Sequence, residues 1–457
     1  MVTTPIKRFE LLLASVCLLG LIAGSASAQT SVSATGSASS VPASATPPAI
    51  GDGAGAPGPE GTAGQGALTS VGQKSRSDYD AIGVHVGSFI LNPDVEIKET
   101  YNSNIYVTTT HAQEDYFTTI SPFVSLNSGW NTHSLGLSVG GDINRYANHP
   151  TEDNDNYSVS ANGRLDILEG MYAKASGGYQ LLHEPRSSPN AANGLTPTEY
   201  SNTGGSIGFS KENSIIGIQL DASLNDYAYR NVATSRGVPV IQTNRDRTEY
   251  QASAKVSYEI VQGYHAVVKA IGSERDYRQK IDAGGLQRTS TGYEFDAGAA
   301  VKLASKVDGE VFVGYLSRSF DDPRLRDADG IGFGLSLLWN VNDLTSIKGS
   351  VIRSIEESIL ANASSILQTN VSVGVEHELL RNVILAGNFN YSNQEYQGFG
   401  RVDDVYGFDV SAKYLLNRYM SASIGAAYNN KASNSFGVAV GANYDQTMFT
   451  AKLRLQL

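Results

Sequence analysis

The chain has 457 residues, of which only 17% are charged, and its formal net charge is −11. The negative balance argues against a nucleic-acid partner. Glycine (47 residues) and tyrosine (24) are abundant, a composition that suits a chain whose surface partly faces lipid and suits a helical enzyme poorly.

Residues 1–28 have the features of a secretory signal peptide. A positively charged start is followed by an apolar core at residues 11–23 and by small residues at the expected cleavage site, 26–28. Because the core is too short to cross a bilayer, we expect cleavage rather than anchoring. The only cysteine, Cys17, lies inside this core, so the exported chain should have neither disulfides nor thiolate chemistry.

Residues 29–77 consist largely of Ala, Ser, Gly, Thr and Pro, with almost no large apolar side chain. A segment of this composition cannot bury a core. The sequence therefore predicts a disordered periplasmic tail at 29–77, ahead of one folded domain at 78–457.

From residue 78 onward, apolar and polar residues alternate, as at 216–224, 250–260, 293–303 and 406–414. A period of two is the pattern of a β-strand with one apolar and one polar face, and the segments have about the length of a tilted membrane strand. The last segment, 444–457, alternates up to the chain end. Because an open strand edge in lipid leaves backbone groups unpaired, this strand should pair with the first strand and close a ring.

The connections alternate between short and long. Short turns are expected near residues 131–132, 169–170, 212–213, 262–263, 305–306, 342–343, 380–381 and 417–418, and longer polar loops lie between them. This pattern predicts an all-β fold, a transmembrane antiparallel up-and-down β-barrel of about 18 strands, in the bacterial outer membrane with both termini periplasmic. The count changes by two if a long loop hides a hairpin. A soluble sandwich or β-helix is the alternative, but soluble strands are usually shorter.

Aromatic residues cluster near the expected strand ends. They predict two girdles at the membrane interfaces. The candidates beside the long loops are Tyr101, Tyr146, Tyr179, Tyr227, Tyr277, Phe320 and Tyr396, and those beside the short turns are Tyr172, Tyr258, Tyr264, Trp339 and Tyr419.

A series of short motifs, in this order, resembles the putative β-barrel porin 2 family of Gram-negative outer membranes. The motifs are Gly87-Ser88-Phe89, Tyr101-Asn102-Ser103-Asn104, Gly163-Arg164-Leu165-Asp166, Leu338-Trp339, His377-Glu378-Leu379-Leu380-Arg381-Asn382, Arg401-Val402-Asp403 and Tyr414-Leu415-Leu416-Asn417-Arg418-Tyr419. The resemblance covers about residues 82–457 and implies a porin. Some members resemble barrels associated with exopolysaccharide clusters, which implies export and a polysaccharide export apparatus as a partner. The terminal Leu457 departs from the usual Phe.

The polar faces of the strands supply the candidate pore-lining residues, which are Arg164, Asp166, Lys174, Asp221, Lys255, Glu259, Glu294, Asp296, Glu310, Lys348, Asp409, Lys413, Lys452 and Arg454. Acidic and basic members are interspersed and nearly balanced. Charge selectivity needs one dominant sign at a constriction. The balance therefore favours an outer-membrane pore for neutral or mixed polar solutes, such as a saccharide chain. Alternatively, these charges pair across strands and simply hold the wall together.

Two other functions remain open. A barrel enzyme acting at the cell surface would use rim residues such as His183, Glu184 and Asp226, and a structural or adhesive barrel would be plugged by its own loops. No catalytic residue, metal ligand or cofactor site is assigned: G-x-S-x-G strings at 136–140 and 204–208 lie inside strands rather than in the required elbow, and Arg381 replaces the second histidine of H-E-x-x-H. The expected partners are outer-membrane lipid and lipopolysaccharide.

Overall fold

The computed structural model describes residues 68–192, 194–212, 214–282, 284–303, 306–360, 363–434 and 443–457. The predicted signal peptide and all of the predicted tail up to residue 67 lie outside these ranges. Among the described residues, no helix has both the length and the apolar character needed to cross a bilayer.

The fold is a closed antiparallel β-barrel of 18 strands, as the alternating pattern predicts. Each wall strand pairs with its neighbours in chain order, and β2 pairs with β21 from Asp94↔Gln456 to Asn102↔Met448, which closes the ring. The wall strands are β2 (Phe89–Asn102), β3 (Asp115–Ser128), β4 (Ser134–Tyr146), β5 (Asn154–Leu168), β6 (Met171–His183), β7 (Glu199–Lys211), β8 (Ile216–Tyr229), β11 (Arg247–Val261), β12 (Tyr264–Tyr277), β13 (Ser290–Leu303), β14 (Val307–Phe320), β15 (Ala328–Asn342), β16 (Thr345–Glu357), β17 (Ser365–Leu380), β18 (Val383–Tyr396), β19 (Val402–Asn417), β20 (Met420–Ser433) and β21 (Tyr444–Gln456).

Among the described residues, six short elements lie outside the wall. The strand β1 (Val84–Val86) forms a hairpin with the start of β2, and β9 (Val232–Ala233) pairs with β10 (Pro239–Val240) within one long loop. Three 3₁₀ turns, η1 (Val71–Gln73), η2 (Pro150–Glu152) and η3 (Thr243–Arg245), precede β2, β5 and β11 respectively.

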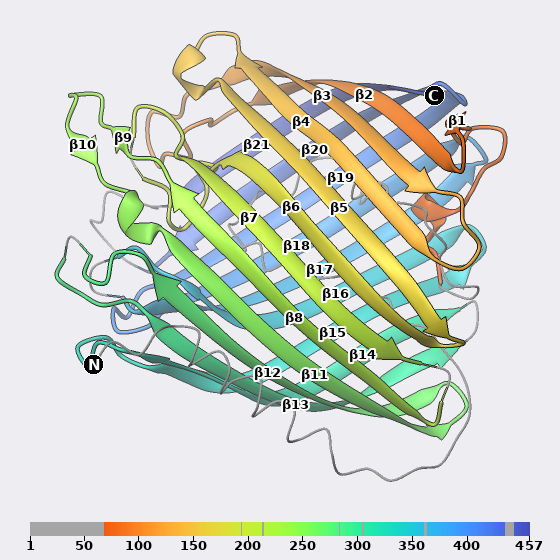
Figure 1. Cartoon of the computed structure of the whole chain (residues 1–457). Helices are drawn as coiled ribbons and strands as arrows, with labels where there is room; N and C mark the ends of the chain where they lie inside the picture. Colours follow the sequence, from red (N-terminus) through yellow and green to blue (C-terminus); the bar gives the residue numbers. More distant parts are fainter. Residues whose placement is uncertain are drawn as a thin grey trace.

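The two ends of the barrel differ. At the short-turn end, consecutive strands are joined by turns such as Glu169-Gly170 between β5 and β6, where Gly170 takes a φ of 69° that favours glycine. At the long-loop end, the connections include residues 184–198 and 230–246. The first residue of β2 and the last of β21 lie together at the short-turn end, on the right in Figure 1. The predicted alternation of loop lengths is confirmed.

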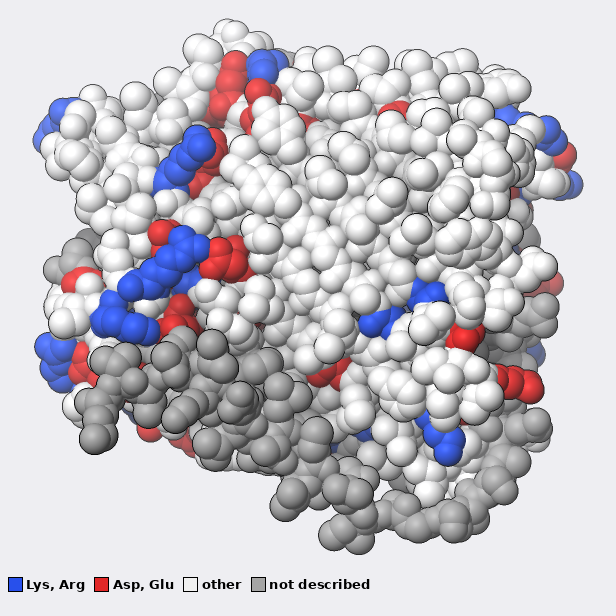
Figure 2. All heavy atoms as spheres, viewed as in Figure 1, with Lys and Arg blue, Asp and Glu red and all other residues white. Residues whose placement is uncertain are grey.

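The strand pleat separates an apolar outer face from a polar inner face. Large apolar side chains on the outer face remain exposed, for example Ile260 and Ile424 (67% each) and Ile331 (65%). In the upper half of the view in Figure 2, a broad uncharged surface separates charged side chains near the two ends. Such a band matches the hydrocarbon layer that a barrel wall must face.

The prediction of a disordered tail as far as residue 77 is wrong for its last part. Residues 68–76, here called the peg, enter the lumen at the short-turn end, and Ser70 and Val71 are fully buried there. The segment has little apolar surface, but its backbone N–H groups and Arg76 find hydrogen-bond partners on the barrel wall. Order here comes from the surrounding barrel rather than from the segment's own composition.

The predicted aromatic girdles are also partly wrong. Tyr227, Tyr277 and Tyr396 are buried (1%, 4% and 3% exposed) among inward-facing groups of the lumen, and Tyr172 is buried as well. Outward-facing candidates such as Tyr179, Tyr258, Tyr264, Trp339 and Tyr419 remain exposed, as a girdle requires. Near a strand end, a shift of one residue reverses the face, so sequence position alone does not assign it.

Candidate functional site: the lumen and its two ends

The inner wall of the lumen carries ion pairs, most of which join neighbouring or nearby strands. Arg164 Nη2 lies 2.7 Å from Asp166 Oδ1, and Lys174 Nζ lies 2.9 Å from Asp221 Oδ1. Further pairs are Lys255–Glu310, Lys348–Glu376, Lys269 with Glu294 (3.6 Å) and Asp296 (3.4 Å), Lys452–Glu96 (3.3 Å) and Arg454–Asp94 (3.1 Å). Most of the predicted pore-lining charges therefore lie on the inner face with a partner of opposite sign.

The remaining predicted residues also lie on the inner face. Asp409 accepts a hydrogen bond from Asn388 Nδ2 at 2.8 Å, and Glu259 accepts one from the backbone N–H of Gly263 at 3.3 Å. Lys413 lies two pleats from Asp409 along the same face of β19. Whether any of the fourteen contacts a solute stays a prediction.

Several partners were missed by sequence reasoning. Asp94 and Glu96 lie on the inner face of β2 opposite β21, and Glu376 lies on the inner face of β17 opposite Lys348. All three follow the alternation of their strands, which was the available signal. The two acidic residues of β2 become neighbours of Arg454 and Lys452 only because the first and last strands pair.

The peg is bound to the inner faces of β15, β16 and β17. The backbone N–H of Val71 donates to Ser346 Oγ at 2.8 Å, and Asn340 Nδ2 donates to the carbonyl of Thr69 at 3.0 Å. Arg76 forms a 2.7 Å ion pair with Glu378, and the two side chains are 6% and 17% exposed. The segment therefore fills part of the lumen at the short-turn end.

A cavity of about 360 Å³ lies in the lumen beside the peg. Leu68 of the peg, Lys255 and Glu310 of one ion pair, and Lys348 of another contribute to its lining. His265, Lys302 and Asp308 also line it, together with small or hydroxyl residues of the wall. Four lysines, three acidic residues and several hydroxyl groups thus surround one space, and the two signs of charge are nearly balanced.

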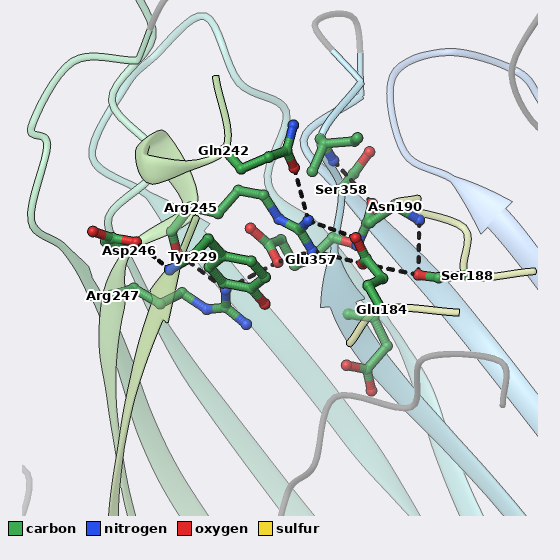
Figure 3. Close-up of polar contacts among 12 residues, drawn as sticks. Glu184, Ser188, Asn190, Tyr229, Gln242, Arg245, Asp246, Arg247, Glu357 and Ser358 are labelled. Atoms are coloured by element: carbon green, nitrogen blue, oxygen red, sulfur yellow. Dashed lines mark hydrogen bonds and ion pairs between the residues drawn. The ribbon is translucent and has the colours of Figure 1, made fainter. Parts of the chain in front are cut away.

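At the long-loop end, a second network bridges the lumen. Arg245 donates two hydrogen bonds of 3.0 Å to the carboxylate of Glu184, in the loop after β6. Arg247 Nη1 lies 3.0 Å from Glu357 Oε2, at the end of β16, and Arg245 Nη2 lies 3.8 Å from the same oxygen. Figure 3 shows Glu357 between the two arginines, with Asn190 beside Glu184. Loops from well-separated parts of the ring therefore meet over the lumen.

The bridging groups are buried, and Arg245 keeps its charge. Arg247 is fully buried, and Arg245 and Glu184 are each 5% exposed. Burial alone would lower the pKa of the Arg245 guanidinium, but the adjacent Tyr229 and the carboxylates of Glu184 and Glu357 outweigh burial and hold that pKa above its ordinary value. Arg245 also lies over the Tyr229 ring, 4.0 Å from its centroid.

A separate buried cluster joins β19 and β20. Asp403 is completely buried and lies 2.6 Å from Arg401 Nη2 and 2.9 Å from Lys431 Nζ. Burial by itself lowers the pKa of Arg401, but the bond to Asp403 more than offsets it and the pKa is raised.

The rim residues considered for an enzyme have structural partners. Glu184 holds Arg245, Asp226 accepts a hydrogen bond from Thr248 Oγ1 at 2.8 Å, and the backbone N–H of His183 donates to Asn156 Oδ1 at 3.0 Å. In the part of the chain that the structure describes, no group of three or more His, Cys, Asp or Glu residues is placed to hold a metal ion.

The family model described as "Putative beta-barrel porin 2" matches residues 76–457, the whole barrel. The chain belongs to the Putative beta-barrel porin 2 family. No curated protein matches it significantly. As a member of this porin family it is an outer-membrane channel for polar solutes.

Solved Pseudomonas aeruginosa structures resemble this porin at low identity. OpdK with vanillate is 12% identical, with 80% of this chain and 99% of OpdK covered and a TM-score of 0.45. OccK2 (OpdF) in complex with glucuronate is 10% identical, with 81% and 99% covered and a TM-score of 0.45. OpdO is 13% identical, with 80% and 97% covered and a TM-score of 0.43.

Proposed function

We propose that this porin passes saccharides through its lumen, and that it exports an exopolysaccharide chain. The supporting observation is the inner wall, where acidic and basic side chains are interspersed and paired with each other. A wall with no dominant sign of charge does not repel a long, hydroxyl-rich chain at any one level. We further propose that the long-loop end faces the outside and that both barrel termini face the periplasm, where an export apparatus would bind.

We also propose that the outer face near the long loops contacts lipopolysaccharide. Outward-facing tyrosines there donate hydrogen bonds to carboxylates, as in Tyr391 to Asp404 (2.7 Å) and Tyr428 to Asp445 (2.6 Å). The Arg145–Asp155 pair (2.6 Å) lies on the same face. Polar groups at this height are compatible with a sugar headgroup layer and would be costly in hydrocarbon.

Purified full-length protein in planar bilayers and in liposomes would test conduction. We expect ionic current and swelling in isotonic solutions of neutral mono- and disaccharides. A folded protein that gives neither current nor swelling would contradict the pore. The alternative would then be a structural barrel, which the contacts that bridge the lumen at both ends favour. Export is tested separately in a strain from which this porin is deleted. If the porin exports the polysaccharide, that strain should retain it in the periplasm.

A further inference from the structure

The wall ladder is incomplete between β15 and β16. Their pairing runs from Asn342↔Thr345 only as far as Gly334↔Ile352. By contrast, β14 remains paired with β15 up to Ala328, and β16 remains paired with β17 up to Glu357. Over their outer parts, residues 328–333 and 353–357, the two strands therefore have a ladder partner on one side only.

The outer part of the β16–β17 hairpin is bonded to β12 and to the loop before β13 instead. We call residues 353–360 and 363–369 the hairpin arm. Arg275 Nη2 of β12 donates to the carbonyl of Ile355 at 3.0 Å, although β13, β14 and β15 lie between β12 and β16 in the ring. Arg288 Nη1 donates to the carbonyl of Ser358 at 2.9 Å. The arm thus stays joined to β18 up to Ile366↔Tyr396 and is bonded toward β12 inside the lumen, which leaves the β15–β16 seam open.

The arm covers a row of guanidinium groups. The arginine wall consists of Arg245, Arg247, Arg275 and Arg318, from the loop before β11 and from β11, β12 and β14. The arm supplies part of its countercharge: Glu357 lies 3.0 Å from Arg247, and Glu356 lies 3.9 Å from Arg275. The rest comes from Glu184 and Glu249.

Two guanidinium groups of the arginine wall keep unmet bonding capacity in the described residues, although Arg247 is paired with Glu249 and Glu357 through its other nitrogens. Arg318 is 6% exposed and donates to the hydroxyls of Ser273 (2.7 Å) and Ser290 (3.1 Å), with no carboxylate among its bonded partners in the described residues. Arg247 is fully buried, and its Nη2 has no hydrogen-bond partner in the described part of the chain. A buried guanidinium group without a countercharge is costly and favours an anionic ligand.

We propose that the arginine wall is a binding site for an acidic solute carrying carboxylate groups, and that the hairpin arm is the lid over it. Glu356 and Glu357 occupy the site in place of such a solute. When the solute takes over these arginines, the arm returns to the wall and the β15–β16 ladder continues in the same register, with Ile331 opposite Ile355. This deepens the proposed function, because the site lies in the lumen that the solute would cross.

Engineered disulfides distinguish the two positions of the arm. Cysteines replacing Ile331 and Ile355 face each other only when the ladder is complete, because neighbouring strands must bring Cβ atoms within about 4.5 Å for a bond to form. The matched control replaces Leu335 and Val351, which are already paired in the same register. The only natural cysteine, Cys17, lies in the predicted signal peptide. The variants are oxidised in liposomes, and disulfide formation is then measured by the change in gel mobility.

We expect the control pair to oxidise readily under all conditions. The Ile331→Cys, Ile355→Cys pair should oxidise slowly alone, and faster by roughly 5-fold or more with galacturonate but not with galactose. Combining this pair with Glu356→Gln and Glu357→Gln should accelerate oxidation without any solute. A test pair that never oxidises while the control does would overturn the lid, and equal rates with both sugars would overturn the acidic ligand. The disulfide readout does not depend on conduction. A barrel that oxidises as expected but carries no current would therefore contradict the proposed function and leave the lid proposal intact.

Discussion

The backbone N–H of Gly72 donates a hydrogen bond of 2.8 Å to Glu376 Oε2, across 304 positions of sequence. The other carboxylate oxygen of Glu376 is bonded by the ammonium group of Lys348. One side chain of the wall therefore holds the peg and closes an inner-wall ion pair at once. Changes to the peg and changes to the lumen charges should for this reason influence each other.

Replacing Gly72 with alanine should release the peg. A Cβ atom at this position would lie 2.9 Å from Glu376 Oε2, so the carboxylate must shift and its bond to the Gly72 N–H is weakened. We expect higher single-channel conductance and new trypsin cleavage after Arg76, which is 6% exposed in the bound peg. Ser77→Ala, at an exposed position, is the control. Unchanged conductance together with an uncleaved Arg76–Ser77 peptide bond would contradict this account.

Breaking one inner-wall ion pair should create ion selectivity. Lys255 and Glu310 form a pair beside the lumen cavity, so the wild-type pore should show a reversal potential near zero in a salt gradient. Glu310→Gln leaves the lysine unpaired and should favour anions, whereas Lys255→Met should favour cations. The double variant should return to weak selectivity. If both single variants behave like wild type, this pair does not face the conducting path.

Replacing Asp403 with asparagine should strongly destabilise the barrel. Its carboxylate is completely buried between Arg401 and Lys431, and removing it leaves two buried cations without a countercharge. We expect a loss of about 3–5 kcal/mol in unfolding free energy, measured by urea titration of tryptophan fluorescence. The control is Asp155→Asn, because the Arg145–Asp155 pair is 49% and 36% exposed. That change should cost below about 1 kcal/mol, and similar losses for both variants would refute the explanation.

The contact between the β12–β13 and β14–β15 loops should resist acid. Asp322 accepts hydrogen bonds from Arg324 Nε (2.9 Å) and from the backbone N–H groups of Gln287 and Arg324 (3.0 Å each). The Arg324 side chain first, then these N–H groups, hold the pKa of Asp322 well below its ordinary value of 3.8. The bonds therefore contribute fully above pH 3.8 and are lost only as the pH falls through the lower, folded-state pKa.

Amide resonances of Gln287 and Arg324, followed by NMR in nanodiscs, would measure this titration. We expect a midpoint below pH 3.8 in the wild-type protein and no titration in Asp322→Asn, whose loops should exchange faster at every pH. A wild-type midpoint at or above 3.8 would show that the ionised carboxylate gains nothing from folding.

The wall could be predicted from the sequence because its signals are local. Alternation in stretches such as 250–260 assigns both the strand and its faces, and turns such as Gln262-Gly263 mark where it reverses. The inner-face charges follow from the same alternation. Counting short turns and long loops then gave the 18 strands found here.

The features at the two ends could not be predicted, because they depend on contacts between distant parts of the chain. The short polar segment around Ser70 looks like its disordered neighbours until Ser346 and Glu376 are placed beside it. The early end of the β15–β16 ladder at Gly334↔Ile352 depends likewise on which distant groups bond the outer part of β16, such as Arg275 of β12. Nor did Tyr277 reveal its inward direction, because it is the last residue of its strand.

The position of the peg also constrains how the molecule is assembled. Its anchors, from Asn340 to Glu378, belong to β15, β16, β17 and the turn between the first two, which follow it by more than half the chain. The peg is synthesised and exported before the barrel strands, yet its binding site does not exist until these late strands have formed. Insertion of the peg is therefore one of the last steps of maturation, and a barrel stalled before those strands assemble has an unobstructed short-turn mouth.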